Sequence, residues 1–481
     1  MNECYRLPDI GMLIKPHHID EQASMENVNA MKERIAQVLS YFDIGFSSIV
    51  QTVGPSFTLY EITLAHGVRM GKVRCLEDDI ALSIASVGIR IIAPIPGKGT
   101  LGIEVPHQRP SIVQMCDVAG SLKIQSVDME LPVILGKTIT GKAKVLDLSK
   151  APHILIGGST GRGKSSTIHT LITSLLLKKN PDELKFVIVD TKKTEYNVYE
   201  LLQNHFLAGI TDESGHIITD TDEAVQVLES LCEEMDFRYN LLKKAGCRFI
   251  KEYNDKFRKG ELEPEMGHRF MPYIVLIVDE FGDLMLSRGK EVELPLCRIA
   301  QLARTVGIHA IIATQRPTMN IITGSIKANF PTRFSFRVAC VMDSRLLIDQ
   351  SGAQQLVAPG DMLISHGYAM PERLQATFTD RLDIERIVKH ISEQHGQAYY
   401  YSLPKVKAKE SETVCVDMKR LEQLLHDAAI AEDEEDSFDE YTSDSFMSDM
   451  EREQLIKVLN QSMKDLETIR KRMNKILEML R

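Results

Sequence analysis

The chain has 481 residues, of which 43% are hydrophobic and 26% charged, so it is long enough for two or three domains with hydrophobic cores. Its first residues lack the basic and apolar regions of a secretory signal, and no run of about 18 apolar residues predicts a membrane span, so we expect a cytoplasmic protein. The net charge of −10 by itself disfavours a nucleic-acid partner, but nine acids gather in residues 432–449, which leaves the rest of the chain close to neutral.

The N-terminal quarter of the chain predicts a small domain. We interpret residues 1–25 as an N-terminal arm and residues 26–118 as a small α+β domain. A helical pattern at 28–42 precedes short β-rich runs, of which 57–64 and 88–94 are the clearest.

The next part of the chain, residues 119–400, has the pattern of an α/β domain with a predominantly parallel sheet. Short apolar runs alternate with helical segments, and buried parallel strands covered by helices have this pattern. The expected strands are 153–157, 186–190, 274–279, 310–314 and 334–338, and 222–245 is an expected amphipathic helix.

The C-terminal part divides into two segments. Residues 401–450 are polar and acidic, which predicts a disordered linker. In residues 451–481 apolar side chains recur at a 4-3-4 spacing, broken at Ser462, which predicts a coiled-coil helix. The alternative for that segment is a single helix that docks on the preceding α/β domain of the same chain.

A phosphate-binding loop follows the expected strand 153–157. The segment satisfies GxxxxGK[ST] and leads into a helical run; it comprises Gly158, Ser159, Thr160, Gly161, Arg162, Gly163, Lys164 and Ser165, followed by Ser166. Glycines let backbone N–H groups converge on a phosphate at the start of a helix. We therefore predict ATP as ligand, with Lys164 at its β- and γ-phosphates and the Ser165 hydroxyl in a Mg²⁺ shell.

Two further strand ends complete the predicted catalytic set. The apolar strand 273–278 is followed by Asp279, which is expected to hold magnesium-bound water, and Glu280, which is expected to activate the attacking water. The alternative is that both acids only cap the next helix. A third strand ends at Thr314 and Gln315, which are candidates for sensing the γ-phosphate, although polar residues are common at strand ends.

Over roughly residues 6–379 the chain resembles the motor region of the FtsK/SpoIIIE DNA translocases. The resemblance rests on ordered segments rather than on the phosphate loop alone. These segments are 93–104, 158–165, 278–285, 307–309, 313–317, 322–329, 331–333, 343–345 and 360–363.

The resemblance implies a RecA-like motor, preceded by the small domain and assembled as a hexameric ring around double-stranded DNA. ATP would bind between subunits, and an arginine from the neighbour would complete each site, with Arg345 as the first candidate and Arg333 as the second. A motor that moves over any sequence should contact DNA phosphates. The candidates for these contacts are Arg288, Lys290, Lys327 and Arg373.

The sequence also departs from the family pattern. A block of membrane helices and a C-terminal winged helix, both usual in full-length members, are not visible, and Asp190-Thr191-Lys192 replaces the family's Asp-Pro-Lys. Arg162 stands where a small residue is more usual. We expect a DNA translocase for chromosome segregation or mobile DNA transfer, with a protein partner or self-association through the coiled coil. The alternatives are a secretion-type transport ATPase and an ATP-switched scaffold.

Overall fold

The structure is a computed structural model that describes residues 5–14, 21–86, 88–92, 94–95, 98–107, 110–126, 128–210, 217–367, 370–394 and 400–405. Most of the predicted acidic linker and the whole predicted coiled coil lie outside these residues. Within the described part, no helix has both the length and the apolar character needed to cross a membrane.

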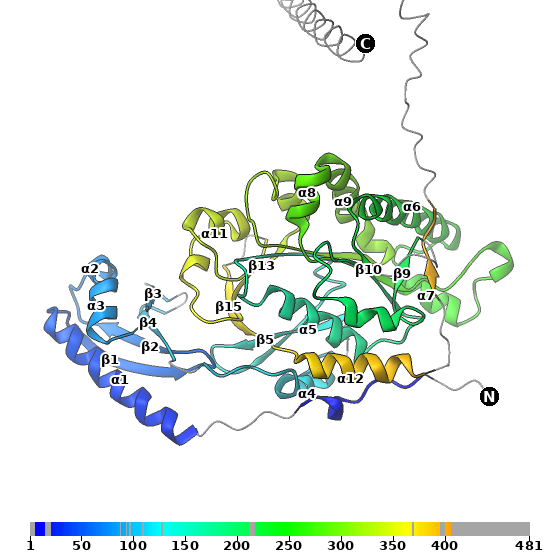
Figure 1. The fold of residues 1–481 in the computed structure, drawn as a ribbon. Helices are drawn as coiled ribbons and strands as arrows, with labels where there is room; N and C mark the ends of the chain where they lie inside the picture. Colours follow the sequence, from blue (N-terminus) through cyan, green and yellow to red (C-terminus); the bar gives the residue numbers. More distant parts are fainter. Residues whose placement is uncertain are drawn as a thin grey trace, which may run out of the picture. The chain divides into compact units, whose positions relative to one another are not determined.

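The small domain is a four-stranded antiparallel sheet with helices packed on it (Figure 1). Its strand order is β1-β2-β4-β3. Its elements are α1 (Glu21–Tyr41), β1 (Phe46–Val53), β2 (Phe57–Leu64), α2 (Met70–Cys75), α3 (Glu77–Ser83), β3 (Arg90–Ile92) and β4 (Leu101–Pro106). Its hydrophobic core runs from Val28 to Val105, whereas Val113 and Met115 belong to the core of the next domain. The domain therefore ends earlier than the predicted residue 118.

The larger domain contains a ten-stranded mixed sheet of order β10-β8-β11-β12-β7-β13-β14-β15-β5-β6. Strands β10 through β13 in this order are parallel, as predicted, and the remaining pairs are antiparallel. The strands are β5 (Pro132–Thr138), β6 (Ala143–Asp147), β7 (His153–Gly157), β8 (Leu184–Val189), β10 (Ile217–Ile218), β11 (Tyr273–Val278), β12 (Ile308–Thr314), β13 (Thr332–Ser335), β14 (Asp361–His366) and β15 (Glu372–Ala376). The parallel part is the half that carries the predicted site.

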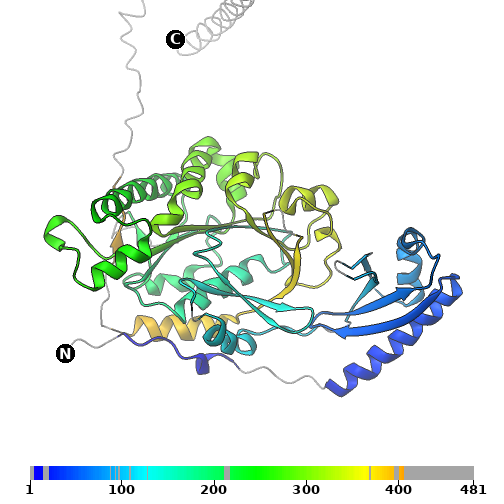
Figure 2. The same cartoon turned by 180° about the vertical axis from the view of Figure 1, so that it is seen from behind.

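Helices cover both faces of this sheet (Figures 1 and 2). One face carries α4 (Met115–Gln125), α5 (Lys164–Leu176) and α12 (Arg381–Ser392). The other carries α6 (Thr221–Ala245), α8 (Phe281–Arg288), α9 (Lys290–Leu302) and α11 (Val341–Ile348). The shorter helices α7 (Ile250–Arg258) and α10 (Gly324–Asn329) complete the domain. Because both faces are covered, β7 and β11 are buried along their whole length and are apolar at nearly every position.

Local sequence explains where the long helix α6 begins and ends. The Asp220 carboxylate accepts hydrogen bonds from the backbone N–H groups of Asp222 and Glu223, so it caps the start. Gly246 ends the helix in the left-handed conformation at φ 62°. These two signals place the helix within one residue of the predicted 222–245.

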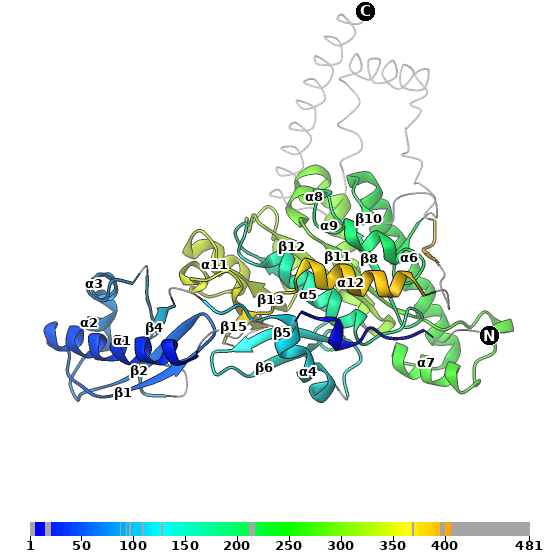
Figure 3. The same cartoon turned by 60° about the horizontal axis from the view of Figure 1, so that its bottom comes forward.

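Both ends of the described chain pack on the larger domain. Tyr5 and Leu13 are buried in its core, and the backbone N–H of Ile14 donates to Asp383 of α12 at 2.9 Å. Figure 3 shows the N-terminal segment beside α12. At the other end β16 (Tyr401–Ser402) pairs with β9 (Ala208–Gly209), and Leu403 is buried. The predicted linker boundary at residue 401 is therefore wrong, because residues 401–405 belong to the folded domain.

Candidate nucleotide-binding site

The predicted phosphate loop forms a tight turn between β7 and α5. Gly161 and Gly163 have φ values of 71° and 114°, which side chains rarely tolerate. A Cβ on Gly163 would lie 3.2 Å from the backbone N and Cα of Gly360, so the loop also has no room for one. The backbone at this turn can therefore approach a phosphate closely at the N-terminus of α5.

Two neighbouring segments form backbone hydrogen bonds with the phosphate loop. The N–H of Ser159 donates to the carbonyl of Arg337 at 2.8 Å, just after β13. The N–H of Gly360 donates to the carbonyl of Arg162 at 2.9 Å, just before β14. The loop conformation is thus fixed by backbone contacts with the segments after β13 and before β14 as well as by its own glycines.

Lys164 lies folded inside the loop. Its Nζ donates to the carbonyl oxygens of Gly158 at 2.7 Å and Ser159 at 3.1 Å. Burial lowers the pKa of Lys164 to about 8, although the carboxylates of Glu280 and Asp279 act in the opposite direction. A phosphate bound in the loop would place negative charge beside the buried Lys164 side chain and so favour its protonated form.

Asp279 lies at the end of β11, next to the start of α5. The Ser165 hydroxyl is 3.5 Å from its Oδ1, and burial raises the pKa of the Asp279 carboxyl. Among the described residues, no group of three or more His, Cys, Asp or Glu side chains is placed to hold a metal. Mg²⁺ bound mainly by phosphate oxygens needs only one or two protein groups, so Ser165 and Asp279 fit a magnesium nucleotide.

Glu280 is buried at the centre of a hydrogen-bond network. Its Oε1 accepts from the Thr314 hydroxyl at 2.9 Å and from the backbone N–H of Gln315 at 3.1 Å, and its Oε2 is 3.0 Å from Lys192 Nζ. Glu280 directly precedes α8, but its side chain makes no capping hydrogen bond to that helix, which contradicts the helix-cap alternative for this residue. These contacts fix the carboxylate at the edge where β11 and β12 end.

The Gln315 side chain connects this network to the phosphate loop. Its Oε1 accepts a hydrogen bond from the Thr160 hydroxyl at 2.7 Å. The structure therefore brings together Lys164, Asp279, Glu280 and Gln315, which come from three strand ends that are adjacent in the sheet.

Two residues of the site carried no role in the sequence analysis. Lys192 was noted only as part of a departure from the family pattern, and its ion pair with Glu280 gives it a place in the site. The phenol of Tyr196 donates to Asp279 Oδ1 at 3.1 Å. No motif marks a tyrosine in a loop that joins two elements, so only the fold reveals it.

The two candidate arginines have different surroundings. Arg345 lies exposed on α11, and its side chain has no partner among the described residues. Arg333 is buried and donates to the carbonyls of Phe330 at 2.9 Å and Lys327 at 2.8 Å, as well as to Asp349. Arg333 therefore has a structural role within its own chain, whereas the Arg345 side chain is exposed.

The structure corrects one of the predicted DNA contacts. Arg373 is 7% exposed, and its guanidinium bonds Glu104 of the small domain and Asp361, so it is not free to contact DNA. Arg288 is partly exposed beside Asp222, and Lys327 pairs with Asp349 at 2.7 Å. Lys290 is exposed at the start of α9.

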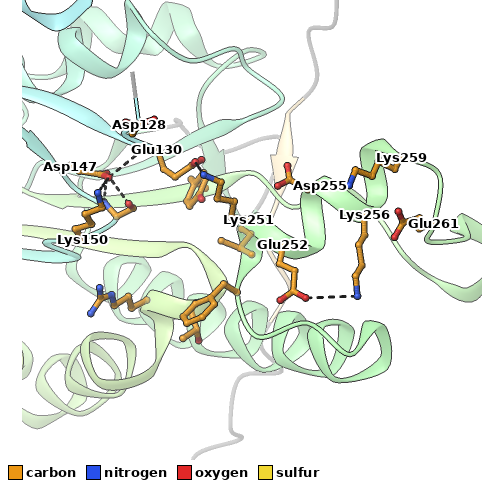
Figure 4. Close-up of a pocket in the computed structure, with 16 residues that line it drawn as sticks. Asp128, Glu130, Asp147, Lys150, Lys251, Glu252, Asp255, Lys256, Lys259 and Glu261 are labelled. Atoms are coloured by element: carbon orange, nitrogen blue, oxygen red, sulfur yellow. Dashed lines mark hydrogen bonds and ion pairs between the residues drawn. The ribbon is translucent and has the colours of Figure 1, made fainter. Parts of the chain in front are cut away.

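A separate cavity of about 640 Å³ lies away from the phosphate loop (Figure 4). Its lining includes Tyr273 at the start of β11 and Thr305 just before β12, so it lies at the opposite ends of the parallel strands. Several of its charges are paired, as in the contact of Lys251 with Glu130 at 2.7 Å. The cavity takes no part in the site described above.

The fold and this site define a P-loop ATPase whose nucleotide-binding domain follows a small α+β domain. Residues 114–319 match the model of the FtsK/SpoIIIE family, and residues 7–107 match that of the FtsK alpha domain. The chain belongs to the FtsK/SpoIIIE family. The second match ends close to the domain boundary that the two hydrophobic cores define.

Named relatives agree with this assignment. The chain is 44% identical over 394 residues to the DNA translocase FtsK of Chlorobaculum tepidum, covering 81% of this chain and 48% of that protein. It is 38% identical over 399 residues to the DNA translocase SpoIIIE of Bacillus subtilis, covering 83% of this chain and 50% of that protein. The chain thus spans about half the length of these curated relatives.

A solved structure has a similar fold. The pCW3 conjugation coupling protein TcpA, in a monomer form with ATPγS, matches with a TM-score of 0.51 and 24% identity. The match covers 74% of this chain and 98% of that one. At this identity the likeness shows the fold alone.

Proposed function

We propose that this chain is the motor of an ATP-driven translocase for double-stranded DNA. The observation that carries the proposal is the buried cluster of Lys164, Asp279 and Glu280 at adjacent strand ends, in a chain closely related to proteins named DNA translocases. The same relatives favour DNA over the protein substrate of a secretion ATPase. A motor acting on chromosomal or mobile DNA would work in the cytoplasm.

The side chains divide the work of ATP hydrolysis. Lys164 leaves the carbonyls of its own loop to bind the β- and γ-phosphates, and residues 158–163 with Ser166 surround them. Ser165 and Asp279 would hold the Mg²⁺, which would supply positive charge beside the phosphates. Glu280 Oε2 takes the proton of the attacking water, while Lys192, Thr314 and Gln315 hold that carboxylate in place.

Gln315 links hydrolysis to movement in this proposal. Its side chain contacts Thr160 in the phosphate loop, and its backbone contacts Glu280. A residue bonded to both groups is placed to respond when the γ-phosphate leaves. The strand end of β12 would pass that response to the loop that follows it.

We further propose that six copies form a ring in which ATP lies between subunits. Arg345 supports this arrangement because it is exposed and lacks a partner in its own chain among the described residues. In the ring, Arg345 of one subunit would stabilise the charge that develops on the phosphoryl group in the next. The segment 451–481 would supply contacts to a protein partner or to another copy.

Exposed cations would contact the DNA. Lys290 is the strongest candidate because it is exposed at the start of α9, and Arg288 and Lys327 follow because exposed acids already pair with them. Contacts to phosphates carry no sequence information, as a translocase requires.

ATPase activity measured with and without linear duplex DNA, together with displacement of a third strand from a triplex, tests the proposal. We expect duplex DNA to stimulate hydrolysis, ATP to drive displacement, and both to weaken as salt rises. The Glu280→Gln variant is the control for contaminating ATPases. Hydrolysis without stimulation and without displacement would refute the DNA motor and favour a protein substrate.

A further inference from the structure

A buried tyrosine lies behind the predicted magnesium site. Tyr196 is fully buried, and its hydroxyl donates to Asp279 Oδ1 at 3.1 Å. The Ser165 hydroxyl is 3.5 Å from the same oxygen atom. One carboxylate oxygen thus accepts from two hydroxyls, one on the phosphate-loop helix and one on the loop after β8.

The backbone that carries Tyr196 is held by the neighbouring strand end. Val189 and Val278 are paired in the sheet, so Asp190 and Asp279 follow at the same edge. The buried Asp190 carboxylate accepts hydrogen bonds from the backbone N–H groups of residues after it, including Tyr196 at 3.4 Å. The turn from β8 is therefore wound around Asp190 in a way that aims Tyr196 at Asp279.

The ring of Tyr196 is held by two other rings, those of His169 and Tyr199. It packs against His169 of α5 with ring centroids 4.9 Å apart, and against Tyr199 with centroids 6.2 Å apart. His169 Nδ1 lies 2.9 Å from the Tyr199 hydroxyl, which closes the cluster. A phenol held on both sides cannot swing away from Asp279 without disturbing α5, the helix that begins at the phosphate loop.

We propose that Tyr196 is a positioning residue for magnesium binding: its hydroxyl holds the Asp279 carboxylate in the orientation that receives the magnesium nucleotide. The inference rests on the proposed function and extends it to a residue outside every motif of the sequence. Without this donor, the only hydroxyl of the two that still contacts Asp279 Oδ1 is that of Ser165, at 3.5 Å, so the carboxylate is held less firmly. Groups that orient metal ligands in this way typically contribute about 10- to 100-fold to metal affinity.

Tyr199 provides a matched control. It belongs to the same ring cluster and is also fully buried, but its hydroxyl bonds His169 and not Asp279. Tyr196→Phe and Tyr199→Phe each remove one buried hydroxyl and keep the ring. A role in packing alone predicts similar effects of the two substitutions, whereas a role in positioning Asp279 predicts an effect of the first only.

The test measures ADP affinity in Mg²⁺ and in EDTA, by titration calorimetry on the full chain. The ratio of the two dissociation constants gives the enhancement of nucleotide affinity by magnesium. We expect Tyr196→Phe to reduce this enhancement about tenfold and to leave the affinity in EDTA unchanged. Tyr199→Phe should keep the wild-type ratio, and thermal unfolding of both variants measures any loss of folding.

A second readout uses turnover. In Tyr196→Phe the free Mg²⁺ concentration for half-maximal ATPase activity should rise about tenfold, with the ATP KM at saturating Mg²⁺ within twofold of wild type. An enhancement ratio within twofold of wild type, or an equal loss in Tyr199→Phe, would overturn the inference. The binding measurement needs no DNA and no turnover. It can therefore refute the role of Tyr196 even if DNA stimulates hydrolysis, and support that role even if DNA does not.

Discussion

Replacing Arg373 with Met removes the centre of a buried charge cluster that joins the small domain to the larger domain. Arg373 Nε donates to Asp361 Oδ1 at 2.8 Å, Nη1 bonds Glu104, and the guanidinium lies 4.0 Å from the centre of the Phe57 ring. The carboxylate side chains of Glu104 and Asp361 are each 1% exposed. The substitution therefore leaves two buried carboxyl groups without their shared cation.

The expected loss follows from those surroundings. Removing one partner of a buried ion pair typically costs about 3–5 kcal/mol, because the remaining charge is left uncompensated. Here Arg90 stays 3.5 Å from Glu104, and the N–H of Val357 still donates to Asp361 at 3.2 Å. We therefore expect Arg373→Met to lower the free energy of unfolding by about 3 kcal/mol, at the lower end of that range.

Urea unfolding followed by circular dichroism measures the loss, with two further variants for comparison. Lys98→Met breaks the exposed pair with Glu61 and should cost at most about 1 kcal/mol. Adding Glu104→Gln to Arg373→Met removes one of the orphaned charges, so the double variant should be less destabilised than the two single losses added together. A cost for Arg373→Met no larger than that of Lys98→Met would refute the reasoning.

Three more substitutions test the site and the core. Glu280→Gln should lower kcat by about 100-fold or more and leave ATP binding intact; weakened binding would contradict a purely catalytic role. Arg345→Ala should also lose turnover, and mixing it with Glu280→Gln should restore activity at interfaces that combine an intact Arg345 with an intact Glu280; mixtures that stay inactive would contradict action in trans. Burial lowers the pKa of both His153 and His309 to about 3, so the unfolded state binds more protons below pH 6.5 and stability falls as pH falls. Between pH 6.5 and 5.5 the two should cost about 2 kcal/mol, and His309→Gln should halve that loss in urea unfolding; an unchanged pH slope would contradict it.

Much of the parallel sheet was predictable because its strands are buried on both faces. For β7 and β11 the predicted bounds agree with the structure within one residue, whereas β8, β12 and β13 each begin two residues before the predicted start. The antiparallel strands β14, β15, β5 and β6 were not predicted. Their side chains include Arg373 and Asp361, which pair with each other inside the protein and in the sequence look like surface charges.

The site was predictable to the extent that its residues follow strands. Lys164, Asp279, Glu280 and Gln315 each follow an apolar run, and parallel strands bring such positions to one edge. Tyr196 and Lys192 lie in the turn after β8, whose path depends on the Asp190 carboxylate and its backbone partners. The path of such a turn cannot be predicted from the pattern of apolar and polar residues.

The cluster around Arg373 also explains why the phosphate loop and the small domain depend on the same segment. Gly360 donates its N–H to Arg162 in the loop and would meet a Cβ on Gly163, and the next residue, Asp361, binds the arginine that holds Glu104. A shift of the loop at residues 162–163 would therefore act on the backbone of Gly360. The next side chain, Asp361, is linked to the small domain through Arg373. Asp361 and Glu104 share one guanidinium, so a displacement of Asp361 would also act on the cation that pairs with Glu104. Pairing with Arg373 accounts for a buried acid at position 104, in a strand whose other buried residues carry no charge.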